Sequence, residues 1–448
     1  MAKNLNMTQG RPARLLLIFA LPLMFGNIFQ QLYTVVDTAI VGRGVGMNAL
    51  AALGTVDWLT WMMLGIAQGY TQGFCVRIAQ KYGEGDGLGL KKTIGQSAVL
   101  AVLIAIIGTI ISQIGLPLFL NMLKVPVDLR PMAELYARTI MGGFCAIMFY
   151  NFCAACLRAI GDSKTPLKAM IVAAFTNIVL DMIAVFVLDW GIAGAAAATI
   201  AAQCLSGVIC AIKIYKTPEL QFGREDMKFD SMLSKNLIKI GTPVAAKNII
   251  IALGGMAVQT IVNGFGMSFI AGFTATNKLY GILEIAAISY GYAVTTYIGQ
   301  NYGAKRMDRI KKGMRSAVVL ALATSVVISA IMILFGRKIT MLFISAEDPA
   351  LVAAAGNTAY EFLFIMCIGL PVLYMLYVFL SALQGLGNTV VPMLSGIIEF
   401  IIRVTVAFVV GKIGYESGIF WAESAAWVGA AVFLFAGYCR DMKKLEKQ

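Results

Sequence analysis

The chain is 448 residues long, with 59% hydrophobic residues, only 13% charged residues and a mean hydropathy of +0.80. This composition lies far outside the range of soluble domains and predicts an integral membrane protein with many spanning helices. The net charge of +13 does not indicate a nucleic-acid partner, because the basic residues are distributed as a membrane topology requires. The chain has no histidine, which excludes the usual His-containing zinc sites and His-based catalytic triads.

Apolar stretches predict twelve spanning helices, long enough to cross a bilayer core of about 30 Å. We expect them at residues 14–42, 47–77, 93–117, 130–156, 166–188, 191–213, 237–264, 267–301, 314–335, 349–382, 389–411 and 415–438. Lys and Arg are concentrated in the segments of one side, whereas the other side has only Arg43, Lys124, Arg130, Arg337, Lys338 and Lys412. This bias predicts a multi-pass protein of the cytoplasmic (inner) membrane with both termini in the cytoplasm.

Three motifs of the first half return in the second half. FALPLMFGN near the start is matched by KIGTPVAAKN, which aligns Pro22 with Pro243. IAQKYGEGD returns as IGQNYGAKR, and LRAIGDSKTP returns as LQGLGNTVVP, which aligns Gly161 with Gly387. The repeat spacing predicts an all-α fold of two six-helix lobes in parallel orientation, a pattern typical of transporters that rock two lobes about a central site. We place the lobes at residues 1–214 and 236–448, with a cytoplasmic linker at 215–235.

Between Arg14 and Arg43, the first predicted helix contains a single charge, Asp37. The polar residues Asn27, Gln30 and Tyr33 precede it at spacings of three and four, so they form one stripe with Asp37 along the helix. Pro22 removes a backbone donor and predicts a kink near the inner end. A lone carboxylate in a spanning helix is costly unless it faces protein or water, and it therefore indicates a functional site.

Three further polar residues accompany Asp37 at a similar depth. Asp181 is the one charge between Lys168 and Asp189, Asn177 lies one turn earlier, and Thr199 lies near the start of the next helix. Two carboxylates, an amide oxygen and a hydroxyl suit a hard monovalent cation, or a proton shared between the carboxylates. The alternative is that each polar group only bonds a neighbouring helix. If Na⁺ is the ion, these four residues are the expected metal ligands.

The second half does not repeat this acidic set. Asp37 aligns with Val258 and Asn177 with Arg403, so the predicted cation site belongs to one half only. Glu399 lies four residues before Arg403, which predicts a buried ion pair within one helix. The roles of the other buried charges are left open by the sequence, as either structural pairs or cavity-lining groups: Lys247, Lys278, Glu284 and Glu361.

Nucleotide-driven transport is not expected. The glycines at 85–89 and the following Lys91 and Lys92 have the wrong spacing for a phosphate-binding loop, and no buried strand precedes them. We therefore expect no cofactor, and uphill transport would draw on an ion gradient.

These motifs together resemble the multidrug and toxic compound extrusion (MATE) transporters. The resemblance rests on PLMFGNIFQQLYTVVDTAIVG, AQKYGEGD, RAIGDSKTP, NIVLD and GIAGAAAAT, which occur in this order. It implies a monomeric antiporter, not an enzyme, that exports amphipathic, often cationic compounds in exchange for H⁺ or Na⁺. Similarity to the DNA-damage-inducible branch implies a cation site at Asp37, Asn177, Asp181 and Thr199, helix bending at Pro22, and substrate contacts at Gln30, Tyr33, Asn151 and Met170.

Two alternatives remain open at this stage. A flippase for lipid-linked precursors would also have long helices and several lobes, although it would favour a cationic cavity for phosphate groups. A membrane-embedded enzyme is the second alternative, since paired membrane aspartates can serve proteolysis, but the chain lacks a His-based metal motif and a nucleophile elbow.

Overall fold

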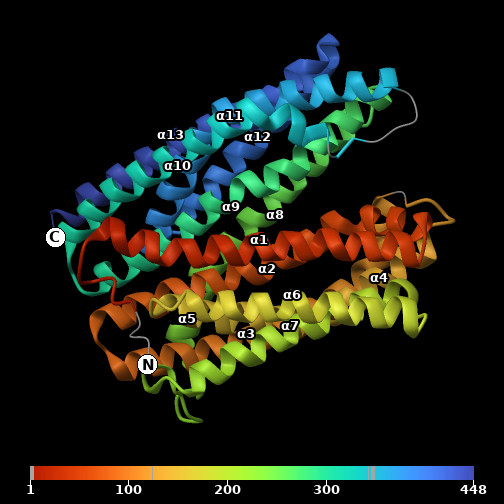
Figure 1. Ribbon diagram of the computed structural model, residues 1–448. Helices are drawn as coiled ribbons and strands as arrows, with labels where there is room; N and C mark the ends of the chain where they lie inside the picture. Colours follow the sequence, from red (N-terminus) through yellow and green to blue (C-terminus); the bar gives the residue numbers. More distant parts are fainter. Residues whose placement is uncertain (1–4, 124, 342, 345–348, 448) are drawn as a thin grey trace. The chain divides into compact units, whose positions relative to one another are not determined.

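A computed structural model describes residues 5–123, 125–341, 343–344 and 349–447, and these ranges contain helices and no strand. The helices follow one another along the chain in Figure 1 as α1 (Pro12–Gly44), α2 (Met47–Glu84), α3 (Gly87–Met122), α4 (Arg130–Gly142), α5 (Phe144–Ala159), α6 (Lys164–Met182), η1 (Ile183–Val187), α7 (Gly191–Tyr215), η2 (Pro218–Leu220), α8 (Ser231–Val262), α9 (Met267–Gly303), α10 (Met307–Met341), α11 (Pro349–Gly385), α12 (Val390–Ile413), η3 (Glu416–Phe420) and α13 (Trp421–Leu445). Every predicted spanning segment coincides with helix, which confirms the all-α membrane fold.

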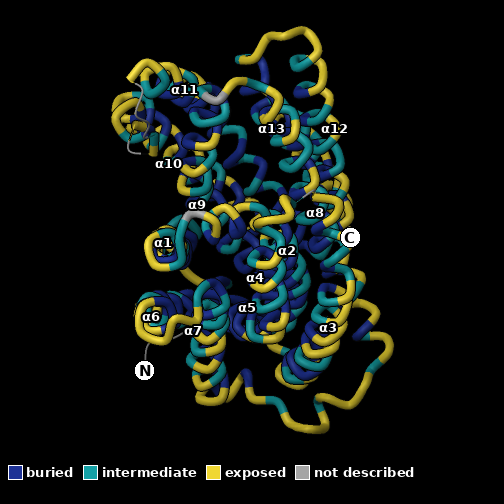
Figure 2. Tube along the Cα trace, turned by 90° about the vertical axis from the view of Figure 1, so that its right-hand side faces the viewer, coloured by how far each residue is buried: buried dark blue, intermediate teal, exposed yellow. Residues whose placement is uncertain are grey.

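Length and apolarity mark ten helices of the described chain as candidate spans, or eleven if α4 and α5 count as one broken span. The long helix α9 is not among them, because many Gly, Ser, Thr and Tyr residues and two charges, Lys278 and Glu284, reduce its hydropathy. Figure 2 shows how these helices expose one side and bury the other. On α3, Ile107, Ile111 and Ile114 are exposed while Ala101 and Ala105 are buried, as expected for a helix with one lipid-facing side.

One predicted helix is broken. We expected a single span over 130–156, but α4 and α5 meet at a bend of 43° at Gly143. Gly143 has no side chain, and a Cβ atom there would collide with the side chain of Ile200 on α7. The break therefore permits a close approach of α7, and the Gly142–Gly143 pair is its sequence signal.

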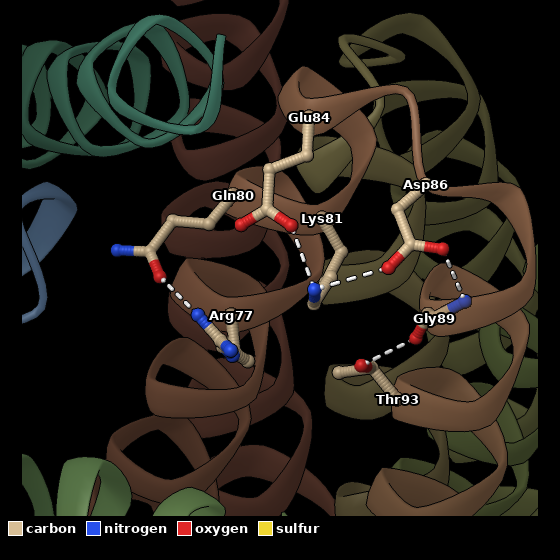
Figure 3. Close-up of polar contacts among 7 residues, drawn as sticks. All are labelled: Arg77, Gln80, Lys81, Glu84, Asp86, Gly89 and Thr93. Carbon is tan, nitrogen blue, oxygen red and sulfur yellow. Dashed lines mark hydrogen bonds and ion pairs between the residues drawn. The ribbon is translucent and has the colours of Figure 1, made fainter. Parts of the chain in front are cut away.

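The helices α2 and α3 are also longer than predicted, because α2 continues to Glu84 and α3 begins at Gly87. A tight turn between the two helices caps both of these ends. Gly85 ends α2 with a positive φ of 72°, and the Oδ1 atom of Asp86 accepts a hydrogen bond of 2.8 Å from the backbone N–H of Gly89 (Figure 3). The Nζ atom of Lys81 lies 2.6 Å from Glu84 and 3.1 Å from Asp86. The hydrogen bond from Gly89, with the Lys81 ammonium, holds the pKa of Asp86 below its usual value. The structure thus assigns the glycines of this segment to a helix cap rather than a phosphate loop.

The segment after α7 is held by one buried glutamine of α3. The Nε2 atom of Gln96 donates to the carbonyl oxygens of Asp226 and Lys228, at 3.2 and 2.5 Å. Its Oε1 atom accepts from the Asp230 backbone N–H at 3.1 Å and from the Ser234 hydroxyl at 3.0 Å. The predicted linker is therefore ordered by a complete set of amide hydrogen bonds.

The chain divides into two compact units. The first unit consists of the chain up to Met7 and of Leu21–Ala246, and the second consists of Thr8–Ala20 and the chain from Lys247 onward. In the first, α7 packs on α5 and α6, and α2 packs on α5; in the second, α11 packs on α9, α10 and α13. The division falls inside α1 next to Pro22, and inside α8 close to Pro243. The lobe and linker boundaries expected from the sequence remain a prediction.

Equivalent turns in the two halves have the same unusual backbone conformation. Gly161 and Gly387, which the repeat aligns, have φ values of 91° and 89°. Gly85 is matched by Lys305, which keeps a positive φ of 55° although lysine has a Cβ atom. The turns are thus conserved between the halves in backbone shape even where the residue type is not.

Candidate cation site

Asp37 lies in the last quarter of α1, which is continuous through Pro22. The residue is 8% exposed, although several of its helical neighbours, among them Leu32 and Val35, are exposed. Farther along, a Cβ atom on Gly44 would collide with Val185 and with the ring of Phe186. This close approach places the end of α1 against η1, and Asp37 on the side of α1 that faces protein.

Asp181 and Asn177 lie one helical turn apart on α6, and both residues are fully buried. Immediately after them the chain changes from α-helix to the five-residue π-helix η1. A π-helix has a wider turn and is rare, and it occurs preferentially at functional sites. No sequence pattern announced η1, so sequence analysis predicted a regular helix through this segment.

Thr199 enters the site from α7, which packs along α6. The Nδ2 atom of Asn177 donates a hydrogen bond of 3.5 Å to the Thr199 hydroxyl, which itself donates to the carbonyl oxygen of Ala195 at 3.1 Å. One N–H of the Asn177 amide and the hydrogen of the Thr199 hydroxyl are therefore used within the protein, and Oδ1 of Asn177 has no partner within the described residues.

Several oxygen atoms at this place have no hydrogen-bond partner within the described residues. They are Oδ1 of Asp37, Oδ1 of Asn177, both carboxylate oxygens of Asp181, and Oε1 of Gln203. The Asp37 and Asp181 carboxylates are also close enough to interact with each other electrostatically. Two neighbouring carboxylates with unpartnered oxygens are unfavourable in a buried site, because each is desolvated and each repels the other.

A bound cation would remove both penalties. The unpartnered atoms are all acceptor oxygens, which is the donor set that a hard monovalent ion requires, and a proton shared by the two carboxylates would also neutralise the pair. The structure therefore brings together Asp37, Asn177, Asp181 and Thr199, and oxygens of the first three have no hydrogen-bond partner within the described residues. That these residues bind a cation remains a prediction. Among the described residues, no group of three or more Asp, Glu, Cys and His side chains is arranged to hold a metal ion.

Two side chains that sequence analysis did not select lie beside this group. The first is Gln203, whose side-chain amide, like that of Gln30, is within reach of the Tyr33 hydroxyl. Tyr136, buried on α4, interacts electrostatically with both aspartates of the pair. Gln203 lies four residues after Thr199 on α7, so their shared helix face was a usable signal, whereas nothing in the sequence points to Tyr136.

The four expected substrate contacts divide into two pairs. Gln30 and Tyr33 are partly exposed next to Asp37. Asn151 on α5 and Met170 on α6 are buried, and the Asn151 amide donates to the carbonyl oxygen of Ile147 in its own helix at 2.9 Å. No hydrogen bond or ion pair among the described residues joins Asn151 or Met170 to Asp37 or Tyr33. Substrate contact by any of the four remains a prediction.

The second unit contains a different buried cluster of charges. The predicted pair within α12 is confirmed, with 3.9 Å between Glu399 and Arg403, but Arg403 has a shorter ion pair of 2.7 Å with Glu423 of α13. Glu284 of α9 accepts hydrogen bonds from the hydroxyls of Tyr280 and Tyr377 at 3.1 and 2.5 Å. Two of the charges that the sequence left open, Lys278 and Glu361, were expected to be buried but are exposed: Glu361 accepts a hydrogen bond from Ser417 at 3.2 Å, and Lys278 lines a small cavity of about 250 Å³.

The fold, the paired aspartates and the division into two units define a membrane transporter, and comparison with known proteins gives the family. A family model described as MatE matches twice, at residues 22–183 and 243–409, so that one match begins at Pro22 and the other at Pro243. These matches cover well over half of the chain. The chain belongs to the MATE family. Because this family consists of transporters, the expectation that the chain is not an enzyme is confirmed.

Individual relatives agree with this assignment. The chain is 29% identical over 351 residues to the probable multidrug resistance protein YpnP of Bacillus subtilis, an alignment that covers 77% of this chain and 78% of YpnP. It is 26% identical over 423 residues to the probable multidrug resistance protein NorM of Thermotoga maritima, covering 92% and 88% of the two chains. A crystal structure of MATE in complex with MaL6 superposes over the full length of both chains with a TM-score of 0.92, at 21% identity.

Proposed function

We propose that this protein is a secondary active multidrug exporter of the cytoplasmic membrane, which exchanges amphipathic, often cationic compounds for inward-moving H⁺ or Na⁺. The relatives named above are described as multidrug resistance proteins, which supports export of several small molecules rather than of one metabolite. As part of this proposal, both termini lie in the cytoplasm and the protein works as a monomer. The motif similarity to the DNA-damage-inducible branch supports a coupling site in the first half of the chain.

One observation carries this proposal: two buried, neighbouring carboxylates have oxygens without partners within the described residues. A protein that needed Asp37 and Asp181 only for structure would satisfy their oxygens with fixed donors. A site that must take up a cation and release it again leaves those oxygens available. An antiporter needs such a site, since its ion must bind and leave in every cycle.

The coupling follows from the placement of Asp37 on the same helix as Tyr33 and Gln30. When the site takes up H⁺ or Na⁺, its negative charge is neutralised and α1 changes its contacts with η1, with Pro22 as the hinge. The polar face around Tyr33 then rearranges, which weakens a bound cationic compound and releases it outside. Ion and substrate therefore lower each other's affinity, as linkage requires of an antiporter.

The experiment is efflux of a fluorescent cationic dye from vesicles reconstituted with the purified protein, with Na⁺ and H⁺ gradients imposed separately. The test variant is Asp37→Asn, which keeps the shape of the side chain and removes its charge. A matched control is Asp189→Asn, the same chemical change at an exposed turn residue with a φ of 52°, a conformation that asparagine also tolerates.

We expect one gradient to drive export by the wild type and by Asp189→Asn, and neither gradient to drive export by Asp37→Asn. The active gradient identifies the coupling ion. Ion-driven export that survives in Asp37→Asn would contradict the proposed coupling site. If no gradient moves any cationic dye through the wild-type protein, multidrug antiport is wrong, and a flippase assay with a lipid-linked precursor becomes the next experiment.

A further inference from the structure

The buried charges of the second unit differ from the candidate cation site in one respect: they include basic side chains. Lys247 of α8 and Arg403 of α12 are 6% and 5% exposed, and they lie among three glutamates, Glu284, Glu399 and Glu423. Arg403 is paired with Glu423 and, more loosely, with Glu399. Oε1 of Glu399 nevertheless has no hydrogen-bond partner within the described residues, so this carboxylate depends on nearby charge for compensation.

Lys247 supplies a positive charge at longer range, since no ion pair among the described residues joins it directly to a carboxylate. Its ammonium group lies 5.8 Å from the centre of the Tyr377 ring, within the range of a cation–π contact, and it interacts electrostatically with Glu399 and Glu284. A Cβ atom on Gly396 would come within 2.9 Å of the Lys247 Cγ atom. The glycine on α12 therefore makes room for the lysine stem, and a larger residue there would displace it.

The repeat shows that this arrangement replaces a simple helix contact. Lys247 aligns with Gly26 of α1, and Gly396 aligns with Met170 of α6. In the first unit the glycine, Gly26, belongs to α1, and a Cβ atom added to it would meet Leu167 of α6 at 3.6 Å. In the first unit the small residue, Gly26, lies on α1, and the aligned position on α6 is Met170. In the second unit the small residue, Gly396, lies on α12 and faces Lys247.

We propose that the Lys247 ammonium is a tethered cation that permanently fills an acidic, tyrosine-lined site in the second unit. Because the chain supplies its own cation there, the cluster does not exchange an ion with solution. Ion exchange is then confined to the Asp37 site, a consequence that rests on the proposed antiport function. If the lysine side chain is shortened, the site accepts a small primary alkylammonium ion in its place.

The test uses the purified full-length protein and its thermal unfolding in detergent. Lys247→Ala removes the atoms that propylammonium possesses, so propylammonium chloride is the probe. Propanol and potassium chloride at matched concentration control for the apolar tail and for ionic strength, and sodium is avoided because it is a candidate coupling ion. Lys235→Ala, which removes an exposed lysine of the same helix, is the matched control variant.

We expect Lys247→Ala to unfold at a lower temperature than the wild type, and propylammonium to raise its Tm saturably by on the order of 2 °C or more. Propanol and potassium chloride should not reproduce this rise, and wild type and Lys235→Ala should not respond to propylammonium. A Lys247→Ala protein that shows no specific response to propylammonium overturns the proposal, and so does an equal response by the wild type.

A second comparison applies if Lys247→Ala does not fold. The double variant Lys247→Met/Glu399→Gln removes one cation together with one carboxylate, and we expect it to fold better than Lys247→Met alone. If it folds no better, the lysine does not compensate Glu399 and the proposal fails.

Failure of this proposal is distinguishable from failure of the proposed function. We expect the coupling ion to raise the Tm of the wild type and of Lys247→Arg, but not that of Asp37→Asn. A response that persists in Asp37→Asn contradicts the Asp37 site, whatever propylammonium does. A response that is lost in Lys247→Arg contradicts the tethered cation alone.

Discussion

The side-chain amide of Asn177 donates to the hydroxyl of Thr199 across 3.5 Å, and this contact joins α6 to α7 at the candidate cation site. The Thr199 hydroxyl uses its own hydrogen on the Ala195 carbonyl oxygen, so its oxygen is turned toward the site as an acceptor. The hydroxyl is thus both a fixed partner of Asn177 and a potential ion ligand.

Replacement of Thr199 by valine, which has the same shape, should weaken ion coupling without abolishing it. One lost hydrogen bond or ligand of this kind is worth about 1 kcal/mol, which corresponds to a roughly fivefold higher ion concentration for half-maximal efflux. Thr199→Ser keeps the hydroxyl and should remain close to wild type. The measurement is the ion dependence of dye efflux in vesicles. Equal ion dependence for Thr199→Val and Thr199→Ser would show that the hydroxyl does not contribute to ion binding.

Pro22 gives a second prediction, because the division between the two units falls next to it inside an otherwise continuous helix. Pro22→Ala restores a backbone N–H that can bond within the helix, which stiffens α1. We expect slower ion-driven efflux with the ion affinity of the purified protein preserved. Pro117→Ala, the corresponding change inside α3, is the control and should transport normally. Normal turnover in Pro22→Ala would argue against a hinge at this position.

The sequence predicted the helices and singled out the polar residues of the candidate cation site for the same reason, although cation binding there remains a prediction. In an apolar span each charged or amide side chain is costly, so Asp37, Asn177 and Asp181 stand out against their surroundings. Features that carry no such cost were missed. The π-helix η1 has an ordinary apolar sequence, and Tyr136 is only one of many tyrosines.

Long-range pairing was also only partly predictable. The spacing of Glu399 and Arg403 gave the contact within α12, since helical geometry fixes it. The shorter ion pair, to Glu423, depends on how α13 packs against α12, and sequence spacing holds no information on that. The ends of α2 and α3 were misplaced for a related reason: their charged residues were interpreted as loop, whereas Gly85 and Asp86 cap the helices farther along the chain.

Gly161 provides a test of the turn that the two halves share. Its φ of 91° is unfavourable for a residue with a side chain, and an added Cβ atom would collide with the backbone of Leu5. Gly161→Ala should therefore lower stability by about 1–2 kcal/mol or more, seen as a lower thermal unfolding temperature. Gly87→Ala, where the added atom meets open space at the start of α3, should be nearly neutral. Equal effects of the two substitutions would contradict the backbone conformation assigned to Gly161.

Asp86 gives a prediction that concerns stability alone. Its carboxylate caps α3 through the Gly89 N–H and also pairs with Lys81 (Figure 3). Asp86→Ala should lower the free energy of unfolding by about 1 kcal/mol, whereas Asp86→Asn should retain most of the cap because asparagine caps nearly as well. Both variants should keep ion-driven efflux once folded, since the residue lies outside the cation site. A loss of coupling in either variant would contradict a purely capping role.

The lowered pKa of Asp86 sets the pH range in which this contribution acts. The carboxylate binds its proton more weakly in the folded chain than in the unfolded chain, so its stabilising effect is complete above the unfolded value of about 4. The effect is lost as the pH falls through the lower folded value. The stability difference between wild type and Asp86→Ala should therefore shrink on acidification below pH 4, and thermal unfolding of the two proteins between roughly pH 3 and 7 measures it. A difference that stays constant over this range would show that the ionised carboxylate is not what caps α3.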